Sequence, residues 1–213
     1  MRQILCFGDS NTYGLIPGTF SGKGGRRYSR GIRWTSILAE TLREKDCHVI
    51  EEGLCGRTTV FEDPLRDGRK GTDMLPLLLE THAPLDLVIL MLGTNDCKVI
   101  NDASAEVIGM GIERLLEQIR TQSPDSKVLL VSPIALGDRV WEDGYDPEFN
   151  AVSVETSKRL PLIYEQIAEK WKISFLAASE YAKPSEIDRE HMDEEGHRKL
   201  AEAVYQIVVR EVI

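Results

Sequence analysis

The stretch from Leu85 to Leu92 constrains the fold of this chain more than any other feature. It reads Leu-Asp-Leu-Val-Ile-Leu-Met-Leu, so that Asp86 is its only polar residue. Such a run is far shorter than the ~20 residues of a membrane span, and its lack of polar alternation fits a strand that is covered on both faces. Strands of this kind lie in parallel sheets whose two faces carry helices. The run therefore predicts an α/β fold.

Other strand and helix patterns alternate along the chain. Strands are predicted at Gln3–Phe7, His48–Glu52, Leu85–Leu92, Lys127–Ser132 and Ile173–Leu176, and helices at Ile32–Lys45, Asp73–Thr81, Ala103–Gln122, Val154–Trp171 and Glu194–Val212. In the helix at Ala103–Gln122 we assign the core-facing stripe to Val107, Met110, Gly111, Leu115 and Ile119. Right-handed crossovers would place helices on both faces. The pattern predicts a three-layer α/β/α sandwich with a central five-stranded parallel sheet, formed by one domain over residues 1–213.

The composition of the chain argues against several kinds of partner. The formal net charge is −9, whereas a nucleic-acid partner requires a basic surface that neutralises phosphates. The same charge disfavours adsorption to anionic membranes. The spacing of Cys6, Cys47, Cys55 and Cys97 gives no C-x-x-C pair and no Cys/His pattern suited to zinc. The first residues do not form a secretory signal, so we expect a cytoplasmic protein with reduced thiols.

Polar residues of catalytic types follow several of the predicted strands. Ser10 follows the first strand, Asn95 the third, and His191 the fifth. In an open α/β sheet, ligands bind outside the carboxyl ends of the strands, where these residues can converge. Together with a carboxylate they form the inventory of a serine hydrolase. Taken alone, Ser10 is equally a candidate helix N-cap, and its surroundings are not the G-x-S-x-G turn of the α/β-hydrolases.

The segment Asp188-Arg-Glu-His191 supplies a carboxylate and an imidazole three residues apart. In a turn, such a carboxylate can reach Nδ1 of the histidine and leave Nε2 free as a general base. His197 is a rival base, although it lies within a helical pattern where packing is the simpler role. Glu190 is a weaker alternative acid, because adjacent side chains rarely face each other in extended backbone.

Gly53 and Asn95 follow the second and third strands and are candidate oxyanion donors. Acyl transfer creates a tetrahedral oxyanion, which a glycine N–H and an asparagine amide can stabilise. Each residue also has a structural alternative, a tight turn for Gly53 and an Asx-turn for Asn95.

Four segments in this order resemble the four blocks of the SGNH (GDSL-type) hydrolases. They are Gly8-Asp9-Ser10, Gly53-Leu-Cys-Gly56-Arg-Thr58, Gly93-Thr-Asn95-Asp96 and Asp188-x-x-His191. The resemblance covers nearly the whole chain and implies the flavodoxin-like fold of that family. It also implies that Ser10 is the nucleophile, His191 the general base and Asp188 its orienter. The implied oxyanion donors are the Ser10 N–H, the Gly53 N–H and the Asn95 side chain, with no metal or cofactor.

A closer resemblance is to the arylesterase/perhydrolase branch of that family. It depends on Ile50-Glu-Glu-Gly-Leu54, Arg57-Thr-Thr59, Asp63-Pro64 and the run Pro84–Asp96. It implies hydrolysis of short-chain, acetyl-type esters through an acyl-enzyme, with perhydrolase or acyltransferase side activity. The chain departs from the usual pattern at Asn11, in place of Leu, and at Arg189, in place of Gly. Asn11 is tolerated in this branch, whereas Arg189 affects the backbone that presents Asp188.

The resemblance also implies a small substrate pocket and assembly into homo-oligomers. We assign Asp9, Asn11, Cys55 and Trp141 to the substrate pocket. The long segment Pro133–Val152 carries Trp141, Tyr145 and Phe149, which serve either as interface anchors or as a local core of the loop. The free Cys55 and Cys97 are read as small packing residues.

Two further hydrolase functions and one binding function remain open at this point. The hydrolases are a carbohydrate O-acetyl esterase and a lysophospholipase or thioesterase. A flavodoxin-like module that holds a phosphate or flavin at its first loop is the binding alternative. No long apolar run outside the predicted strands and helices offers to line an acyl tunnel, which favours short acyl groups.

Overall fold

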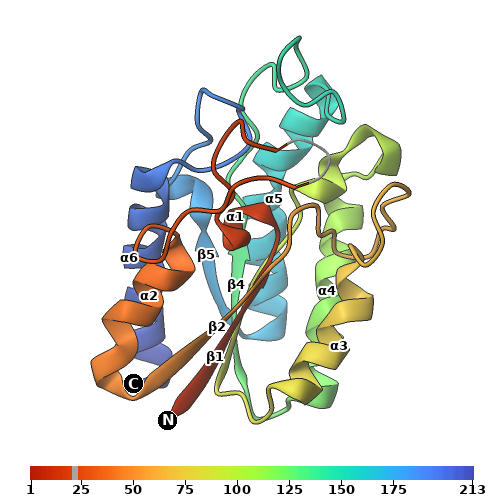
Figure 1. Cartoon of the computed structure of the whole chain (residues 1–213). Helices are drawn as coiled ribbons and strands as arrows, with labels where there is room; N and C mark the ends of the chain where they lie inside the picture. Colours follow the sequence, from red (N-terminus) through yellow and green to blue (C-terminus); the bar gives the residue numbers. More distant parts are fainter. Residues whose placement is uncertain (21–23) are drawn as a thin grey trace.

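The computed structural model describes residues 1–20 and 24–213 and contains a five-stranded sheet (Figure 1). In spatial order the strands are β2 (Cys47–Gly53), β1 (Arg2–Gly8), β3 (Leu87–Met91), β4 (Lys127–Ser132) and β5 (Ser174–Ala177). All neighbouring strands pair in parallel. The predicted α/β fold with a central five-stranded parallel sheet is confirmed.

The apolar run that opened the sequence analysis forms the middle of this sheet. Every residue of β3 is buried, and β3 lies between β1 and β4. Asp86, the polar residue of the run, precedes the strand, and its carboxylate accepts a hydrogen bond of 2.7 Å from the Gln3 N–H. The apolar residues of the run are therefore all buried, whereas its one polar residue lies before the strand and forms a hydrogen bond there.

Helices cover both faces of the sheet. One face carries α2 (Trp34–Leu42) and α6 (Glu194–Val212), and the other carries α3 (Gly71–Thr81), α4 (Ala105–Gln122) and α5 (Ala151–Trp171) (Figure 1). The short helical turns are α1 (Ser10–Tyr13), η1 (Arg43–Lys45), η2 (Asn95–Cys97), η3 (Val99–Asn101) and η4 (Ala178–Glu180). No helix in the described part of the chain combines the length and apolar character needed to cross a membrane.

The two faces of the sheet form two separate hydrophobic cores because side chains alternate along each strand. In β1, Ile4 and Cys6 point into the core beneath α2 and α6, whereas Leu5 and Phe7 point into the core beneath α3, α4 and α5. Ile4 through Phe7 are all fully buried. This alternation is why a strand without polar residues is stable only between two helical layers.

The core-facing stripe of α4 differs from the predicted one. Ile108, Ile112, Leu115 and Ile119 are buried, whereas Val107 and Met110 are 44% and 67% exposed. Both sets have helical spacing, and they differ by a small rotation about the helix axis. The assignment of Val107 and Met110 to the core was therefore wrong, because periodicity alone did not fix the phase of the stripe.

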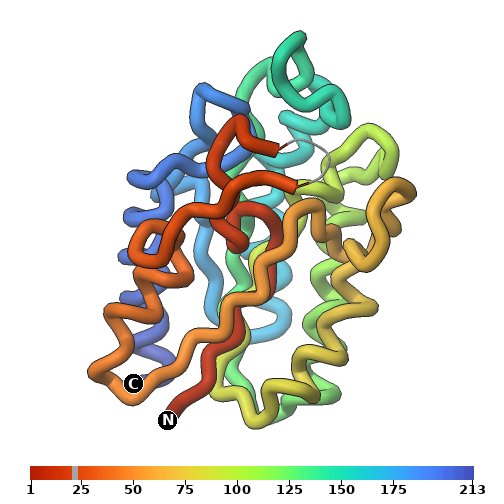
Figure 2. Tube along the Cα trace, in the orientation of Figure 1, coloured from red at the N-terminus to blue at the C-terminus, as the bar shows by residue number. Residues whose placement is uncertain are grey.

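The loops that follow the strands gather at one end of the molecule, opposite both chain termini (Figures 1 and 2). The long segment 133–150 belongs to this end. Its Val140 and Phe149 side chains join the core beneath α5, and its Glu148 forms an ion pair of 2.6 Å with Lys98. Trp141 is 36% exposed. Most of the loop's large side chains therefore anchor it to its own chain.

Candidate active site

Ser10 is the first residue of α1, directly after β1. The Asp9 carboxylate caps this short helix by accepting a hydrogen bond of 2.9 Å from the Asn11 N–H. A Cβ on Gly8 would lie 2.1 Å from Thr12 Oγ1, so only glycine lets α1 fold back against the strand end. This strand-to-helix turn fixes Ser10 at the carboxyl edge of the sheet.

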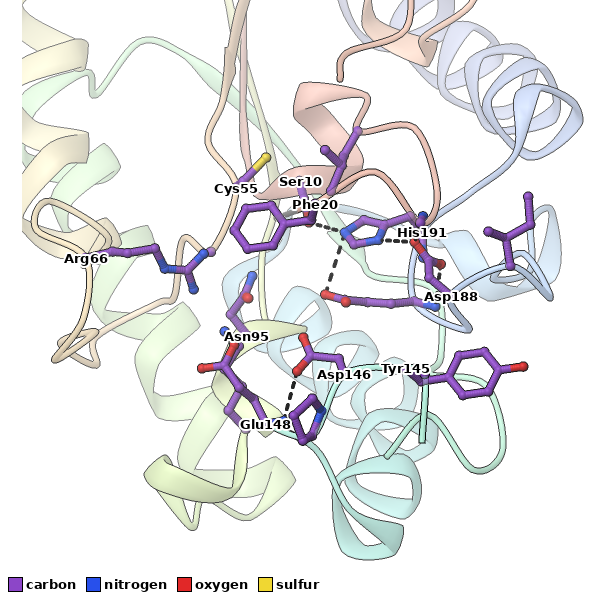
Figure 3. Close-up of a pocket in the computed structure, with 18 residues that line it drawn as sticks. Ser10, Phe20, Cys55, Arg66, Asn95, Tyr145, Asp146, Glu148, Asp188 and His191 are labelled. Atoms are coloured by element: carbon purple, nitrogen blue, oxygen red, sulfur yellow. Dashed lines mark hydrogen bonds and ion pairs between the residues drawn. The ribbon is translucent and has the colours of Figure 1, made fainter. Parts of the chain in front are cut away.

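Ser10, His191 and Asp188 form a continuous hydrogen-bonded chain (Figure 3). Ser10 Oγ lies 2.9 Å from His191 Nε2, and His191 Nδ1 lies 2.8 Å from Asp188 Oδ2. The other Asp188 oxygen accepts a hydrogen bond of 2.9 Å from the His191 N–H. Although burial opposes it, hydrogen bonding to His191 keeps the pKa of Asp188 below its ordinary value. Such a chain can turn a serine hydroxyl into a nucleophile.

The turn that presents Asp188 and His191 is held from both sides. Arg189 adopts a left-handed conformation with φ of 60°, where glycine is favoured and a larger residue needs support from its surroundings. Its N–H donates to the Ser185 carbonyl at 2.7 Å, and its carbonyl accepts from the Gly137 N–H at 2.8 Å. The replacement of glycine by Arg189 thus leaves the Asp188–His191 hydrogen bond intact.

Three residues assigned to the substrate pocket lie elsewhere. Asn11 is buried and links α1 to the His191 segment, because its side chain donates to the Glu190 carbonyl at 3.3 Å and accepts from the Met192 N–H at 3.0 Å. Asp9 is fully buried as the cap of α1. Neither of these two residues nor Trp141 is among the described residues that line the cavity at Ser10. Cys55 does line it, and burial raises the pKa of its thiol to about 11.

Possible oxyanion donors converge beside Ser10. The Asn95 side-chain amide donates one hydrogen bond of 3.1 Å to the Arg57 carbonyl and lines the cavity, which leaves its second N–H for a ligand. Gly56 lines the same cavity with φ of 83°. Neither the Gly56 N–H nor the Ser10 N–H has a hydrogen-bond partner among the described residues.

Gly53, the glycine chosen from the sequence, lies differently. It ends β2 and does not line the cavity as the described residues define it. A Cβ at this position would lie 2.1 Å from the Tyr13 nitrogen, so Gly53 permits close packing between β2 and α1. Gly56, which lies in the same sequence block, was not predicted as a donor. The sequence alone does not show the turn after Gly53, and it is this turn that places Gly56 on the cavity wall.

The cavity at Ser10 has a volume of about 390 Å³ (Figure 3). Apolar side chains on its wall include Leu15, Phe20 and Ile187. Its charged residues are Arg66, Lys98, Asp146, Glu148, Asp188 and Glu190. Arg66 is paired with Asp63 at 2.7 Å, and Lys98 with Glu148. The cavity is therefore small and of mixed polarity.

A second carboxylate lies on the other side of the imidazole. Glu190 Oε1 is 3.6 Å from His191 Nε2, and the Glu190 side chain is 10% exposed. Burial raises the pKa of Glu190. Burial lowers the pKa of His191, but the carboxylates of Glu190 and Asp188 outweigh this effect and raise it above its ordinary value. From its place in the sequence, Glu190 is predicted only as an alternative to Asp188, because spacing does not show that its side chain approaches Nε2 rather than Nδ1 of His191.

His197, the rival base, is fully buried in α6. Its Nδ1 accepts a hydrogen bond of 3.3 Å from the Trp34 N–H, and its ring packs edge-on against Tyr28. Burial lowers the pKa of His197 to about 3. It does not line the cavity in the described part of the chain. His191 is thus the histidine that lies beside Ser10.

The loops behind the cavity are tied together by a buried carboxylate. Asp96 accepts a hydrogen bond of 2.9 Å from the Thr59 N–H and another from the Thr59 hydroxyl. This bond joins the loop after β3 to the loop after β2, which contains Gly56. Within residues 1–20 and 24–213, no cluster of three or more His, Cys, Asp or Glu side chains forms a metal-binding arrangement.

Comparisons with known proteins agree with this fold. The model of the GDSL-like lipase/acylhydrolase family matches residues 6–199. A solved aryl esterase of M. smegmatis, in its inhibitor-bound form, is 33% identical, with all of both chains covered and a TM-score of 0.89. A solved carbohydrate acetylesterase from Sinorhizobium meliloti is 36% identical, with 99% of each chain covered and a TM-score of 0.88. No match is found among curated proteins.

Proposed function

Because the chain belongs to the GDSL-like lipase/acylhydrolase family and is an ester hydrolase of that family, we propose that it is a serine esterase for short-chain, acetyl-type carboxylic esters. The observation that supports the proposal most strongly is the hydrogen-bonded chain from Ser10 Oγ through His191 to Asp188. The three groups come from two ends of the sequence and have the connectivity that acyl transfer requires.

In the proposed mechanism, His191 Nε2 takes the Ser10 proton while Oγ attacks the ester carbonyl carbon. Asp188 holds the imidazole in the tautomer that leaves Nε2 unprotonated, and it stabilises the imidazolium that forms. The alcohol leaves with the proton from Nε2, and an acyl group remains on Ser10. Water, activated by the same nitrogen, then releases the acid. Hydrogen peroxide or an alcohol in place of water would give the perhydrolase or acyltransferase side activity.

The negative charge of the tetrahedral intermediate develops on the former carbonyl oxygen. We assign its stabilisation to three N–H donors, from the Asn95 side chain and from the backbone of Ser10 and Gly56. The support for Gly56 over Gly53 is its place on the cavity wall and its N–H, which has no hydrogen-bond partner within the described part of the chain. Donors fixed before the reaction stabilise the oxyanion without having to reorganise.

The size of the cavity supports a small acyl group. A volume of about 390 Å³ must hold both halves of the ester, and charged side chains interrupt its apolar wall. Preference for a long acyl chain needs ~0.8 kcal/mol of burial for each methylene, which requires a continuous apolar tunnel. A lysophospholipase or thioesterase function is therefore less well supported than cleavage of acetyl esters. The carbohydrate acetylesterase from S. meliloti, at 36% identity, supports carbohydrate O-acetyl esters as a second candidate substrate class.

Hydrolysis of p-nitrophenyl esters from acetyl to decanoyl tests the proposed function, with acetylated sugars measured beside them. We expect kcat/KM to be highest for acetyl and to fall as the acyl chain lengthens. Ser10→Ala serves as the control for background hydrolysis. A value that rises steadily to decanoyl would transfer the assignment to the lysophospholipase or thioesterase class.

We also propose that the protein forms homo-oligomers. The support is a set of apolar side chains exposed on and before α4, with Ile100, Val107 and Met110 at 64%, 44% and 67% exposure. Light scattering coupled to size-exclusion chromatography measures the mass in solution. A monomer at micromolar concentration would contradict the proposal, and Met110→Glu is the variant expected to weaken the assembly.

A further inference from the structure

Glu190 is a carboxylate in the active-site cavity that the proposed mechanism does not use. Its side chain is 10% exposed, and it lines the same cavity as Ser10 and Asn95. No N–H or O–H group in the described part of the chain donates a hydrogen bond to its carboxylate oxygens. Its one charged partner there is His191, at 3.6 Å from Nε2. A buried carboxylate with empty acceptor positions is costly unless a ligand or water donates to it.

The surroundings of Glu190 show what kind of donor fits. Lys98 lines the same cavity, but its ammonium is already paired with Glu148. Asp146 accepts a hydrogen bond of 2.8 Å from the Glu148 N–H, and its negative charge acts on Glu190. Figure 3 shows Asp146 and His191 on this cavity. Among the described residues, His191 is thus the one cationic partner of Glu190.

A neutral hydroxyl fits a cavity that already carries charges of both signs. Arg66 and Lys98 also line the cavity, but each is already paired with a carboxylate, Asp63 and Glu148. A hydroxyl can donate to Glu190 without bringing a further charge into the cavity. An anionic group on the substrate would instead face Glu190 and Asp146.

The reaction geometry places the alcohol half of the ester next to Glu190. In the proposed mechanism the leaving oxygen takes a proton from His191 Nε2, so it must come within hydrogen-bond distance of that nitrogen. Glu190 Oε1 lies 3.6 Å from the same nitrogen. A hydroxyl on the carbon adjacent to the one that bears the ester oxygen is therefore within reach of Glu190 when the leaving oxygen is in place.

We propose that Glu190 determines specificity for the alcohol part by accepting a hydrogen bond from a vicinal hydroxyl, on the carbon next to the one that bears the scissile ester oxygen. The preferred substrates are then partially acylated polyols, a class that includes sugars. This inference rests on the proposed esterase function and adds to it the residue that recognises the leaving group. The negative charge of Asp146, which acts on Glu190, adds to the preference for a neutral donor over an anion.

Three small acetate esters isolate the effect: 2-hydroxyethyl acetate, 2-methoxyethyl acetate and n-propyl acetate. They share the acyl group and nearly the same size, but only the first carries a donor. Burial raises the pKa of Glu190 to about 7, so the esters are compared at a pH above this value, where Glu190 is ionised. For the wild type we then expect kcat/KM for the hydroxyl ester to exceed that of the methoxy ester about tenfold or more, since hydrogen bonds to charged groups are strong. In Glu190→Leu the ratio should fall to about one. A substitution of Glu190 can also change the basicity of His191. Because this change affects all three esters alike, it cancels in the ratio of their kcat/KM values.

Two variants complete the design. Glu190→Gln keeps a carbonyl acceptor without the charge, so its ratio should lie between those of the wild type and the leucine variant. It decides the question if the leucine variant does not fold. Glu186→Gln is the matched control, because Glu186 is exposed in the same segment and does not line this cavity. Its ratio should equal that of the wild type.

The outcomes separate this inference from the proposed function. A wild type that hydrolyses n-propyl acetate without favouring the hydroxyl ester overturns the inference about Glu190 and leaves the esterase function standing. An unchanged ratio in Glu190→Leu overturns it equally. Preference for 2-(trimethylammonio)ethyl acetate over the hydroxyl ester would assign Glu190 to a cation instead. Absence of hydrolysis of any of these esters and of the p-nitrophenyl esters counts against the proposed function itself.

Discussion

The guanidinium of Arg189 lies 4.1 Å from the centre of the Tyr145 ring. Arg189 also donates to the Arg139 carbonyl at 3.2 Å and lies 3.4 Å from a Glu142 oxygen. The residue that separates Asp188 from Glu190 is thereby fastened to the long loop 133–150. Because Arg189 stands where this family usually has glycine, the stacked contact stabilises a left-handed backbone that arginine alone disfavours.

Two substitutions of Arg189 distinguish the effect of its left-handed backbone on stability from the effect of its side-chain contacts. Both Arg189→Ala and Arg189→Gly lose the contact with Tyr145, but glycine adopts the φ of 60° without strain. We expect Arg189→Ala to be less stable than Arg189→Gly by about 1 kcal/mol, the cost of a left-handed non-glycine residue. Urea unfolding at neutral pH measures the difference. Equal stability of the two variants would mean that this turn stores no strain.

Ser10→Ala should abolish ester hydrolysis and leave the fold intact. The hydroxyl hydrogen-bonds to His191 and to no other described side chain, so its loss affects the chemistry far more than the packing. Losses of about 10⁴–10⁶ in kcat are usual when a triad serine is removed. A fluorophosphonate should label the wild type once and the variant not at all. Labelling of the variant at a different residue would show that Ser10 is not the nucleophile.

Asn95→Ala should lower kcat by roughly 10²–10³ while KM changes little. The amide donates to the oxyanion of the transition state more strongly than to the neutral carbonyl of the substrate. Because Asn95 also donates to the Arg57 carbonyl, thermal unfolding is the control for a structural loss. A lower melting temperature together with an unchanged kcat would show that Asn95 stabilises the loop and does not take part in catalysis.

Gly53→Ala should destabilise the protein without a specific effect on catalysis. Its new methyl group would lie 2.1 Å from the Tyr13 nitrogen, and backbone on both sides must then shift. Overpacking of this kind costs about 1–3 kcal/mol or more. We expect a lower melting temperature, with kcat of the folded fraction close to that of the wild type. A stable variant with strongly reduced kcat would return the oxyanion role to Gly53.

The sequence predicted the order and nature of the main strands and helices because their patterns are long and regular. β4 and α6 begin and end at the predicted residues. The stripe of α4 was misplaced, because its exposed Val107 and Met110 are as apolar as its buried residues. The convergence of Ser10, Asn95 and His191 could be predicted because the carboxyl ends of parallel strands lie at one edge of the sheet.

The sequence could not decide which side chains face the cavity. Asn11 and Glu190 are neighbours in space. The Asn11 side chain hydrogen-bonds to the Glu190 backbone carbonyl, whereas the Glu190 carboxylate lines the cavity. The same holds for Gly53 and Gly56, three residues apart in one block. These differences depend on turn conformations, which residue type and spacing leave open.

Burial of His197 should make the stability of the protein depend on pH. Burial lowers the pKa of its imidazole from 6.5 to about 3 in the folded chain, whereas in the unfolded chain the imidazole titrates near its ordinary value. Between these two values only the unfolded state binds the proton. The contribution of His197 is therefore fully present above pH ~6.5 and is lost as the pH falls, by about 1.4 kcal/mol per pH unit.

His197→Asn tests this dependence, because its side-chain oxygen can still accept the hydrogen bond from the Trp34 N–H. We expect the variant to be less stable at pH 7.5, since a ring packed against Tyr28 is lost. Between pH 6.5 and pH 5, however, its unfolding free energy should fall less steeply than that of the wild type, by about 1.4 kcal/mol per pH unit. Urea unfolding at several pH values measures both slopes, and the contributions of all other titrating groups cancel in their difference. Parallel curves would show that His197 is protonated in the folded protein.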